Sequence, residues 1–402
     1  MHRILLILAI TLALWPVAAH AHRFGPPWQA RVSVDRTVVY TQPDAASPAV
    51  GPLERGQIVV VIGETKAETN TEWSQIPDGY VRSGDIVEDV LPWIAEVTQP
   101  SVSIAARPNS KEPIRRTARQ GDLLRVTGAS PGIDGDTSIW WATTEGYISL
   151  SSVRAATSEW ATNWILPNAD LAANGWWGAI RTQANVRTTA TTNGPVVGTL
   201  NPGDRVKVLA EEQGDAVGAN ATWYRIDGGR YAGAFVHSSL INRLPEPKPV
   251  VASPPQSESE TKEPWIAVSR ASATLTFFDA DATPRFSTYV SLGRAGVETP
   301  SGDYDTMGKY RFDTMTSVSV ANADHAYHLP NVPFVQYYRD GGYAIHGTYW
   351  HDHFGQLESQ GCINLTWADS AYLFTLTLPP VAPEDIARWA VNQPATPLVI
   401  LN

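Results

Sequence analysis

Three segments of the chain share one pattern, and this repetition constrains the fold more than any other feature. Each segment has short alternating stretches, a glycine in a turn, a β-branched or leucine-rich run, a tryptophan and a tyrosine. The tryptophans lie 68 and 82 residues apart (141 − 73 and 223 − 141), and the tyrosines lie 67 and 84 apart (147 − 80 and 231 − 147). The tryptophan spacings and the tyrosine spacings nearly agree, which indicates three copies of one small unit. The shared positions are Gly56, Gly121 and Gly203, Trp73, Trp141 and Trp223, and Tyr80, Tyr147 and Tyr231.

Short strands with turn signals between them predict that each unit is a small all-β barrel. We expect repeats at 28–92, 93–156 and 177–242, with a connecting segment at 157–176 between the second and third. Aromatic residues dominate small cores, so we interpret the repeated tryptophans and tyrosines as core residues rather than as a binding surface.

The opening of the third repeat, "ANVRTTATTNGPVVGTL" (184–200), closely resembles a bacterial SH3-like domain. The corresponding arms of the first two repeats are weaker copies of it. The resemblance implies three SH3-like barrels over residues 28–242. In that family such modules bind cell-wall peptide or glycan, or act as spacers.

Residues 243–263, "RLPEPKPVVASPPQSESETKE", are rich in Pro, Ser and Glu and predict a linker. The remainder, 264–402, predicts a separate and mostly β domain with short helices. One helix is expected over 368–376, where Thr366 and Asp369 resemble a capping box. A second is expected over 383–392, with a proline and two acids in its first turn.

The N-terminus has the layout of a secretory signal. An apolar run, 4–14, follows His2 and Arg3, and a small-residue pattern precedes expected cleavage after Ala21. We therefore predict a signal peptide at 1–21 and an exported, extracytoplasmic protein with no membrane attachment after cleavage; a retained anchor is the alternative. The net charge of −10 argues against a nucleic-acid partner, which would need a basic face.

Cys362 is the only cysteine of the chain. A single cysteine in an exported protein is an intermolecular link, a reactive thiol or a buried apolar residue. A reactive thiol needs a base to accept its proton and a third group to orient that base. The predicted strands "YAIHG" and "GCINL" would place His346 beside Cys362 if they are neighbours.

The string around these two residues is more specific than the pair. It resembles the signature of the YkuD-type L,D-transpeptidases, in which His-Gly is followed by a loop and then by Ser-His-Gly-Cys, an apolar residue and Asn or Arg. The stretches "TPSGDY" (299–304) and "GGYAIHGT" (341–348) also fit, and the resemblance covers 264–402. One position departs from the family, because Gln360 stands where a histidine is usual. The matching residues are His346, Gly347, Ser359, Gly361, Cys362, Ile363 and Asn364.

The resemblance implies that the Cys362 thiolate attacks a carbonyl of a peptidoglycan tetrapeptide stem, with His346 as the base. The terminal D-alanine then leaves, and an amine from a second stem resolves the thioester into a cross-link. Carbapenems are the expected covalent inhibitors, and no cofactor or metal is expected. The supporting roles that we predict are oxyanion binding at Gly361, orientation of the imidazole by Gly347, loop support by Ser359 and Asn364, substrate positioning at Gln360 and a cleft wall at Tyr343.

Other readings stay open at this stage. Water could resolve the thioester, which would give an L,D-carboxypeptidase, or a protein amine could, which would anchor that protein to the wall. The last domain could also be inert within a wall-binding scaffold. The chemical alternative is a zinc site, since zinc accepts His, Cys and carboxylate ligands. Its candidate ligands are His325, His328, His351, Asp352, His353 and Cys362.

Overall fold

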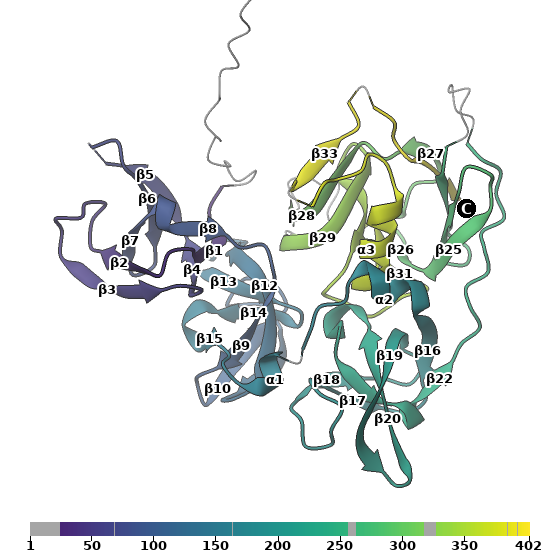
Figure 1. The fold of residues 1–402 in the computed structure, drawn as a ribbon, viewed down its shortest axis with the longest axis horizontal. Coiled ribbons are helices and arrows are strands. Elements are labelled where there is room, and N and C mark those ends of the chain that lie inside the picture. Colours follow the sequence, from purple (N-terminus) through teal and green to yellow (C-terminus); the bar gives the residue numbers. More distant parts are fainter. Residues whose placement is uncertain are drawn as a thin grey trace, which may run out of the picture.

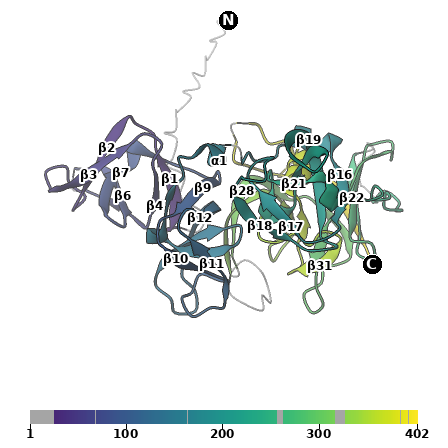
Figure 2. The same ribbon diagram turned by 90° about the horizontal axis from the view of Figure 1, so that it is seen from below.

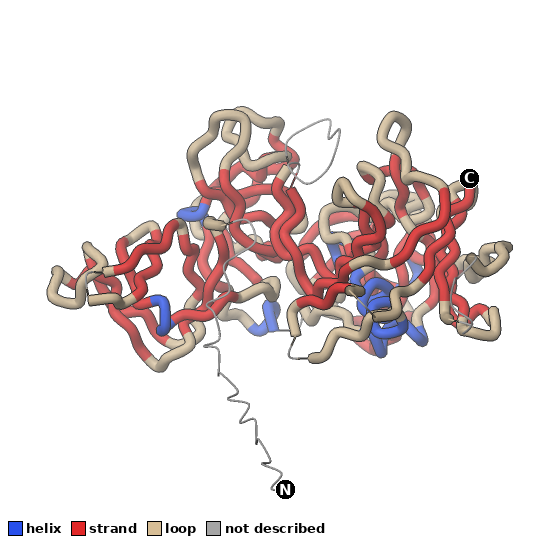
Figure 3. The backbone as a smooth tube through the Cα atoms, turned by 90° about the horizontal axis from the view of Figure 1, so that it is seen from above, coloured by secondary structure: helices blue, strands red, loops and turns tan. Residues whose placement is uncertain are grey.

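The computed structural model describes residues 25–402 except 68, 163, 256–262, 317–326, 384 and 392. The chain is mostly β, as expected, and helices are few (Figure 3). The predicted signal peptide, 1–21, lies outside the described residues. Within the described ranges, no helix is both long enough and apolar enough to cross a membrane.

The three repeats share one strand order. In repeats 2 and 3, seven strands form a single sheet in the order third, second, sixth, fifth, fourth, first, seventh. Repeat 1 has the same order, but its fourth strand is split in two, which divides the sheet into β4-β1-β8 and β3-β2-β7-β6-β5. The third repeat therefore has two relatives of the same topology within its own chain.

The strands of repeat 1 are β1 (Trp28–Val32), β2 (Arg36–Tyr40), β3 (Ala49–Glu54), β4 (Ile58–Val61), β5 (Gly63–Lys66), β6 (Glu72–Ile76), β7 (Gly79–Arg82) and β8 (Ile86–Glu88). Those of repeat 2 are β9 (Trp93–Val97), β10 (Ser101–Ala105), β11 (Ile114–Arg119), β12 (Leu123–Pro131), β13 (Ile139–Thr143), β14 (Gly146–Ser149) and β15 (Val153–Ala155). Those of repeat 3 are β16 (Trp176–Ile180), β17 (Ala184–Arg187), β18 (Val196–Leu200), β19 (Arg205–Val217), β20 (Asn220–Asp227), β21 (Phe235–His237) and β22 (Ile241–Arg243).

Strand register corrects two of the positions that the sequence pattern equated. Trp73 pairs with Arg82, two residues beyond Tyr80, and Trp223 pairs with His237, two residues beyond Phe235. In repeat 2 the residue two beyond Tyr147 is Ser149, and it pairs with Trp140, not with Trp141. The equivalent residues are therefore Trp73, Trp140 and Trp223, followed by Tyr80, Tyr147 and Phe235. Tyr231 instead lies in the 3₁₀ turn η3 (Gly229–Tyr231), which repeat 3 inserts before β21.

The tryptophans are structural, as interpreted from the sequence. Trp73, Trp140 and Trp223 are all buried. The turn glycines Gly56, Gly121 and Gly203 all have φ between 85° and 92°, a region that favours glycine and that explains why the same turn recurs. The segment after repeat 2 forms two short helices, α1 (Glu159–Thr162) and α2 (Ala169–Asn174).

The C-terminal domain consists of two sheets with a shared core. One has the order β25-β24-β23-β34-β27 and the other β31-β26-β32-β30-β29-β28-β33. Its elements are β23 (Trp265–Ser269), β24 (Thr274–Phe278), β25 (Pro284–Tyr289), β26 (Ser291–Gly293), β27 (Gly302–Asp305), β28 (Gly308–Thr316), β29 (His328–Arg339), β30 (Tyr343–Gly347), β31 (Gln356–Ser359), β32 (Ile363–Leu365), α3 (Trp367–Leu376), β33 (Ala387–Trp389) and β34 (Pro397–Leu401). Apolar residues of both sheets and of α3 form the core, among them Ile266, Leu275, Ile345, Ile363 and Leu373.

One helix prediction is confirmed and the other is wrong. Helix α3 begins after Thr366, whose side chain accepts a hydrogen bond from the Asp369 N–H. The segment expected to be helical at 383–392 instead contains strand β33, which pairs antiparallel with β28. Helix propensity is a weak prior that tertiary pairing overrides. Here the Trp389 ring packs against Tyr310, and its N–H donates to the Tyr310 hydroxyl at 2.9 Å. Pairing at the edge of the sheet therefore favours a strand over a helix in this segment.

Repeat 2 lies between repeat 1 and the rest of the molecule, and repeat 3 packs against the C-terminal domain (Figures 1 and 2). Repeat 3 caps a helix that belongs to its neighbour. The Asp227 carboxylate accepts hydrogen bonds from the Trp367 and Ala368 N–H groups at the start of α3. Beside it, the Lys207 ammonium pairs with Asp369, and both side chains are buried.

Repeat 2 also contacts the C-terminal domain directly. The Tyr147 hydroxyl donates to the His328 carbonyl oxygen at 2.7 Å, and the Asn331 side chain donates to the Thr127 carbonyl oxygen at 2.8 Å. Part of the predicted linker packs as well, since Val250 is buried in a cluster with Trp265. Repeats 2 and 3 are therefore docked onto the C-terminal domain.

Candidate active site

Two neighbouring parallel strands carry His346 and Cys362 to one place. In β30 and β32, Ile345 pairs with Ile363 and His346 pairs with Asn364. Cys362 directly precedes β32 and lies two residues before Asn364, on the same face of the sheet. Two residues along a strand and one strand across place the two Cα atoms about 8 Å apart, which two side chains can bridge. Both side chains line one cavity of 430 Å³.

The imidazole of His346 is buried, and its own neighbour fixes its tautomer. Nδ1 lies 3.0 Å from the Gly347 carbonyl oxygen. A carbonyl oxygen only accepts, so Nδ1 carries the proton and Nε2 has the free lone pair. Burial lowers the pKa of His346 to about 4. At neutral pH the ring is therefore neutral, with a basic nitrogen available.

The Cys362 side chain is half-buried. Its Sγ lies 3.6 Å from the Gly342 carbonyl oxygen, to which the thiol donates. Burial raises the pKa of the thiol to about 11, although a hydrogen bond from the Ala344 N–H opposes the shift. In the described part of the chain no hydrogen bond joins Sγ to His346. The resting pair is therefore a neutral thiol and a neutral imidazole rather than a thiolate–imidazolium pair.

These pKa values predict the pH dependence of alkylation at Cys362. The thiolate is the reactive form, so below pH 11 its fraction should rise about tenfold per pH unit. We expect the rate of iodoacetamide labelling, followed by intact mass, to rise steadily from pH 7 to 9.5. Labelling of a small free thiol in the same buffers should instead level off above its pKa of about 8.5. A rate at Cys362 that stays flat between pH 6 and 9 would reveal a preformed thiolate and contradict this expectation.

The turn before Cys362 is tied together by Ser359. The Gly361 N–H donates to Ser359 Oγ at 3.1 Å, and the Ser359 hydroxyl donates to the Cys362 carbonyl oxygen at 2.6 Å. Ser359 thus lies where a loop-supporting residue was expected. The Gly361 N–H, for which an oxyanion role was predicted, donates to Ser359 Oγ here, and the oxyanion role stays a prediction.

A side chain at either glycine of the motif would meet protein atoms. A Cβ on Gly361, whose φ is +110°, would lie 2.7 Å from the Tyr343 ring, and a Cβ on Gly347 would lie 2.5 Å from Ser370 Oγ in α3. Tyr343 was expected to line the cleft, but it is absent from the residues that line the cavity. Its ring packs under Gly361 and beside the Arg339 guanidinium.

Asn364 and Gln360 both line the cavity. The Asn364 amide lies 2.8 Å from Nε2 of His351, whose Nδ1 accepts from the His353 N–H. Burial lowers the pKa of His351 to about 3, so the ring is neutral and its proton is on Nε2. The orientation that satisfies both groups therefore points the amide oxygen at His351. Gln360 differs, since its buried Oε1 has no hydrogen-bond partner in the described chain and remains available to a substrate donor.

Two of the residues proposed as alternative zinc ligands have other partners. His351 contacts Asn364, and the Asp352 carboxylate forms an ion pair with Arg230 of repeat 3. No group of three or more His, Cys, Asp or Glu residues suited to a metal occurs among the described residues. His325 lies outside them. The "HDH" stretch thus connects the C-terminal domain to repeat 3 through Asp352.

Sequence reasoning missed the part of the cavity wall that comes from the repeats. Repeat 2 contributes residues near 106–108 and 142–147, together with Arg115, and repeat 3 contributes Arg230. Trp350 was also missed, although it follows the motif and its ring lies 5.6 Å from that of His346. No local signal marks the repeat residues, because their place depends on how separate modules dock.

Comparison with known proteins agrees with this architecture. Residues 263–400 match the family model described as the L,D-transpeptidase catalytic domain (YkuD), and residues 182–242 match the bacterial SH3 domain. The C-terminal domain is therefore an L,D-transpeptidase catalytic domain, and a bacterial SH3 domain precedes it. No curated protein matches the chain.

Solved structures similar to the chain include L,D-transpeptidases from two organisms. L,D-transpeptidase 3 from Mycobacterium tuberculosis is 21% identical, over 35% of this chain and 62% of that one, with a TM-score of 0.28. An Enterococcus faecium L,D-transpeptidase is 18% identical, over 35% of this chain and 50% of that one, with a TM-score of 0.28. The same M. tuberculosis enzyme bound to a faropenem-derived adduct is 19% identical, over 42% and 66%, with a TM-score of 0.28. The chain thus spans about half to two thirds of the length of these proteins.

Proposed function

We propose that the chain is an exported cysteine acyltransferase, an L,D-transpeptidase that cross-links peptidoglycan stem peptides through a thioester on Cys362. One observation carries the proposal. The only cysteine lines the same cavity as a neutral histidine whose free Nε2 is set by the Gly347 carbonyl. The family match of residues 263–400 supports the same chemistry. Export rests on the leader-like N-terminal sequence.

In the proposed reaction the thiol proton moves first. When the acyl donor enters, the S–H turns from the Gly342 carbonyl to Nε2 of His346, and Sγ bonds to the attacked carbonyl carbon. In this scheme the carbonyl electrons pass to oxygen, and the Cys362 N–H stabilises the resulting oxyanion. The C–N bond of the terminal D-alanine then breaks, and His346 returns the proton to the leaving amine.

The second half of the reaction restores the thiol. An amine from another stem attacks the thioester, loses a proton to His346 and displaces Sγ, which is then reprotonated. Water or a protein amine would use the same thioester, so the acyl acceptor separates transpeptidase from carboxypeptidase and anchoring activities. Proton transfer within the site suits a thiol that rests protonated, since Cys362 becomes a thiolate only as it reacts.

Intact-mass analysis with a carbapenem tests the proposal. The full chain incubated with imipenem should gain one covalent adduct, and Cys362→Ala should gain none. The tetrapeptide stem ending in D-alanine should give a peptide acyl-enzyme on the same cysteine, with release of D-alanine. If wild-type protein forms neither adduct and releases no D-alanine while Cys362→Ala binds the wall equally well, the non-catalytic scaffold replaces this proposal.

A further inference from the structure

The cavity that contains Cys362 and His346 has walls from three modules. Besides the catalytic domain, strand β11 and the β13–β14 turn of repeat 2 line it, and so does η3 of repeat 3. Repeat 2 is held there by the hydrogen bonds from Tyr147 to His328 and from Asn331 to Thr127. A substrate that reaches the thiol therefore meets side chains of the second repeat.

The arginines from the repeats that line this cavity differ in their partners. Arg107 pairs with Glu112 and Asp134, and Arg230 pairs with Asp352. Arg115 has no carboxylate partner within the described chain. Partial desolvation and, after it, the like charge of Arg230 lower the pKa of Arg115, although its side chain keeps solvent exposure. An unpaired guanidinium beside a second one is a favourable place for an anion.

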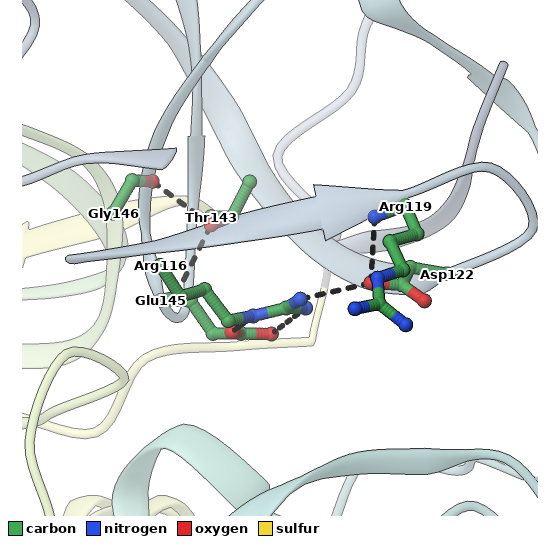
Figure 4. A network of polar contacts seen from close by, with 6 residues as sticks. All are labelled: Arg116, Arg119, Asp122, Thr143, Glu145 and Gly146. Atoms are coloured by element: carbon green, nitrogen blue, oxygen red, sulfur yellow. Dashed lines mark hydrogen bonds and ion pairs between the residues drawn. The ribbon is translucent and has the colours of Figure 1, made fainter. Parts of the chain in front are cut away.

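Arg115 lies at an irregularity in the pairing of β10 with β11, where Arg116 pairs with Ile104 and Ile114 pairs with Ala105. The extra residue of such a bulge has no partner opposite it, and the strand bends there. Next to it, Arg116 is held by the carboxylates of Glu145 and Asp122, as Figure 4 shows. These ion pairs tie β11 to the two turns that contain Asp122 and Glu145, beside the point where Arg115 lines the cavity.

We propose that Arg115 of the second repeat binds a free carboxylate of the acyl-donor peptide and thereby selects anionic donors. This inference rests on the proposed function. The planar guanidinium matches a carboxylate with two parallel hydrogen bonds, and the anion also relieves the repulsion from Arg230. The carboxylate is either the C-terminal group of the peptide or one on a side chain. Repeat 2 is then part of the specificity site of the enzyme, in addition to any wall contact.

The test compares charged and neutral donors on the full chain. The donors are the tetrapeptide stem, the same peptide with a C-terminal carboxamide, and the same peptide with its side-chain carboxylates amidated. For Arg115→Gln, kcat/KM for acylation by the unmodified peptide should fall about 10-fold to 100-fold, the size expected for one charge-assisted contact. The donor whose amidated group is the one that Arg115 binds should react equally with wild type and variant, which identifies that carboxylate.

Two matched variants separate binding from structural support. Arg115→Lys keeps the charge and should recover part of the loss. Arg119→Gln changes an exposed arginine on the same strand that does not line the cavity, and it should leave all three rates unchanged. An equal loss with charged and amidated donors would assign Arg115 a structural role and overturn the inference, and so would the absence of any loss.

The failure of the proposed function would look different. In that case no donor acylates even the wild-type protein. Binding of the unmodified tetrapeptide to Cys362→Ala, measured by calorimetry, then decides the inference by itself. Binding that weakens about 10-fold or more on adding Arg115→Gln, but not Arg119→Gln, supports the carboxylate site. Binding that is absent or unchanged overturns it.

Discussion

Replacement of His346 by glutamine should slow acylation of Cys362 by roughly 10²–10⁴-fold, the usual contribution of a general base. Nε2 of His346 is the only basic nitrogen that the Gly347 contact leaves open on that ring, and the thiol rests protonated because burial raises its pKa. Glutamine keeps a polar group of similar size but cannot accept the proton. The rate is measured by intact mass with imipenem at pH 7.

His353→Gln is the matched control. His353 also lines the cavity, but it is partly exposed and contacts Glu358, so its loss should change the rate little. Thermal unfolding of both variants checks that the fold is retained. A His346→Gln protein that is acylated as fast as wild type would remove His346 from the reaction and with it the proposed mechanism.

The second large effect concerns stability. Lys207→Met should lower the free energy of unfolding by about 3–5 kcal/mol, because it leaves the buried carboxylate of Asp369 without its ammonium partner. The Lys207 side chain is 4% exposed and that of Asp369 is 0% exposed, so water cannot replace the lost charge. The expected measurement is a lower urea midpoint for the transition that unfolds the catalytic domain.

The double variant Lys207→Met/Asp369→Leu tests the reason for that loss. Replacement of both charges by apolar side chains should restore much of the stability, since no buried charge remains. If Lys207→Met alone is as stable as wild type, the pair does not join repeat 3 to helix α3 energetically. Loss of equal size in the single and double variants would point to packing rather than to charge.

Local signals in the sequence predicted much of the architecture. The turn glycines and core tryptophans marked three β units, and Thr366 with Asp369 marked the start of helix α3. The sequence placed His346 beside Cys362 on the condition that the strands "YAIHG" and "GCINL" are neighbours, and their parallel pairing meets that condition. Each of these signals depends on residues close together in sequence, such as a φ above zero, an N-cap or an alternating strand.

The predictions from local signals failed where the structure depends on pairing between segments that are distant in the sequence. The segment 383–392 reads as a helix, but β28 offers an edge on which β33 forms instead. The sequence spacing assigned Trp141 and Tyr231 to the shared tryptophan and tyrosine positions. Strand register assigns Trp140 and Phe235 to them instead. The spacing of residues along the sequence does not reveal an insertion such as η3, which precedes strand β21.

The sequence by itself determined that the chain is mostly β, that it carries three repeats before a catalytic domain, and which cysteine and histidine come together. Only the tertiary structure decided the state and the surroundings of that pair. Burial makes both groups neutral, and Arg115, Tyr147 and Arg230 enclose the cavity from other modules. The physical reason is that burial and docking arise from surfaces that exist only after each module has folded, so no local pattern of residues encodes them visibly.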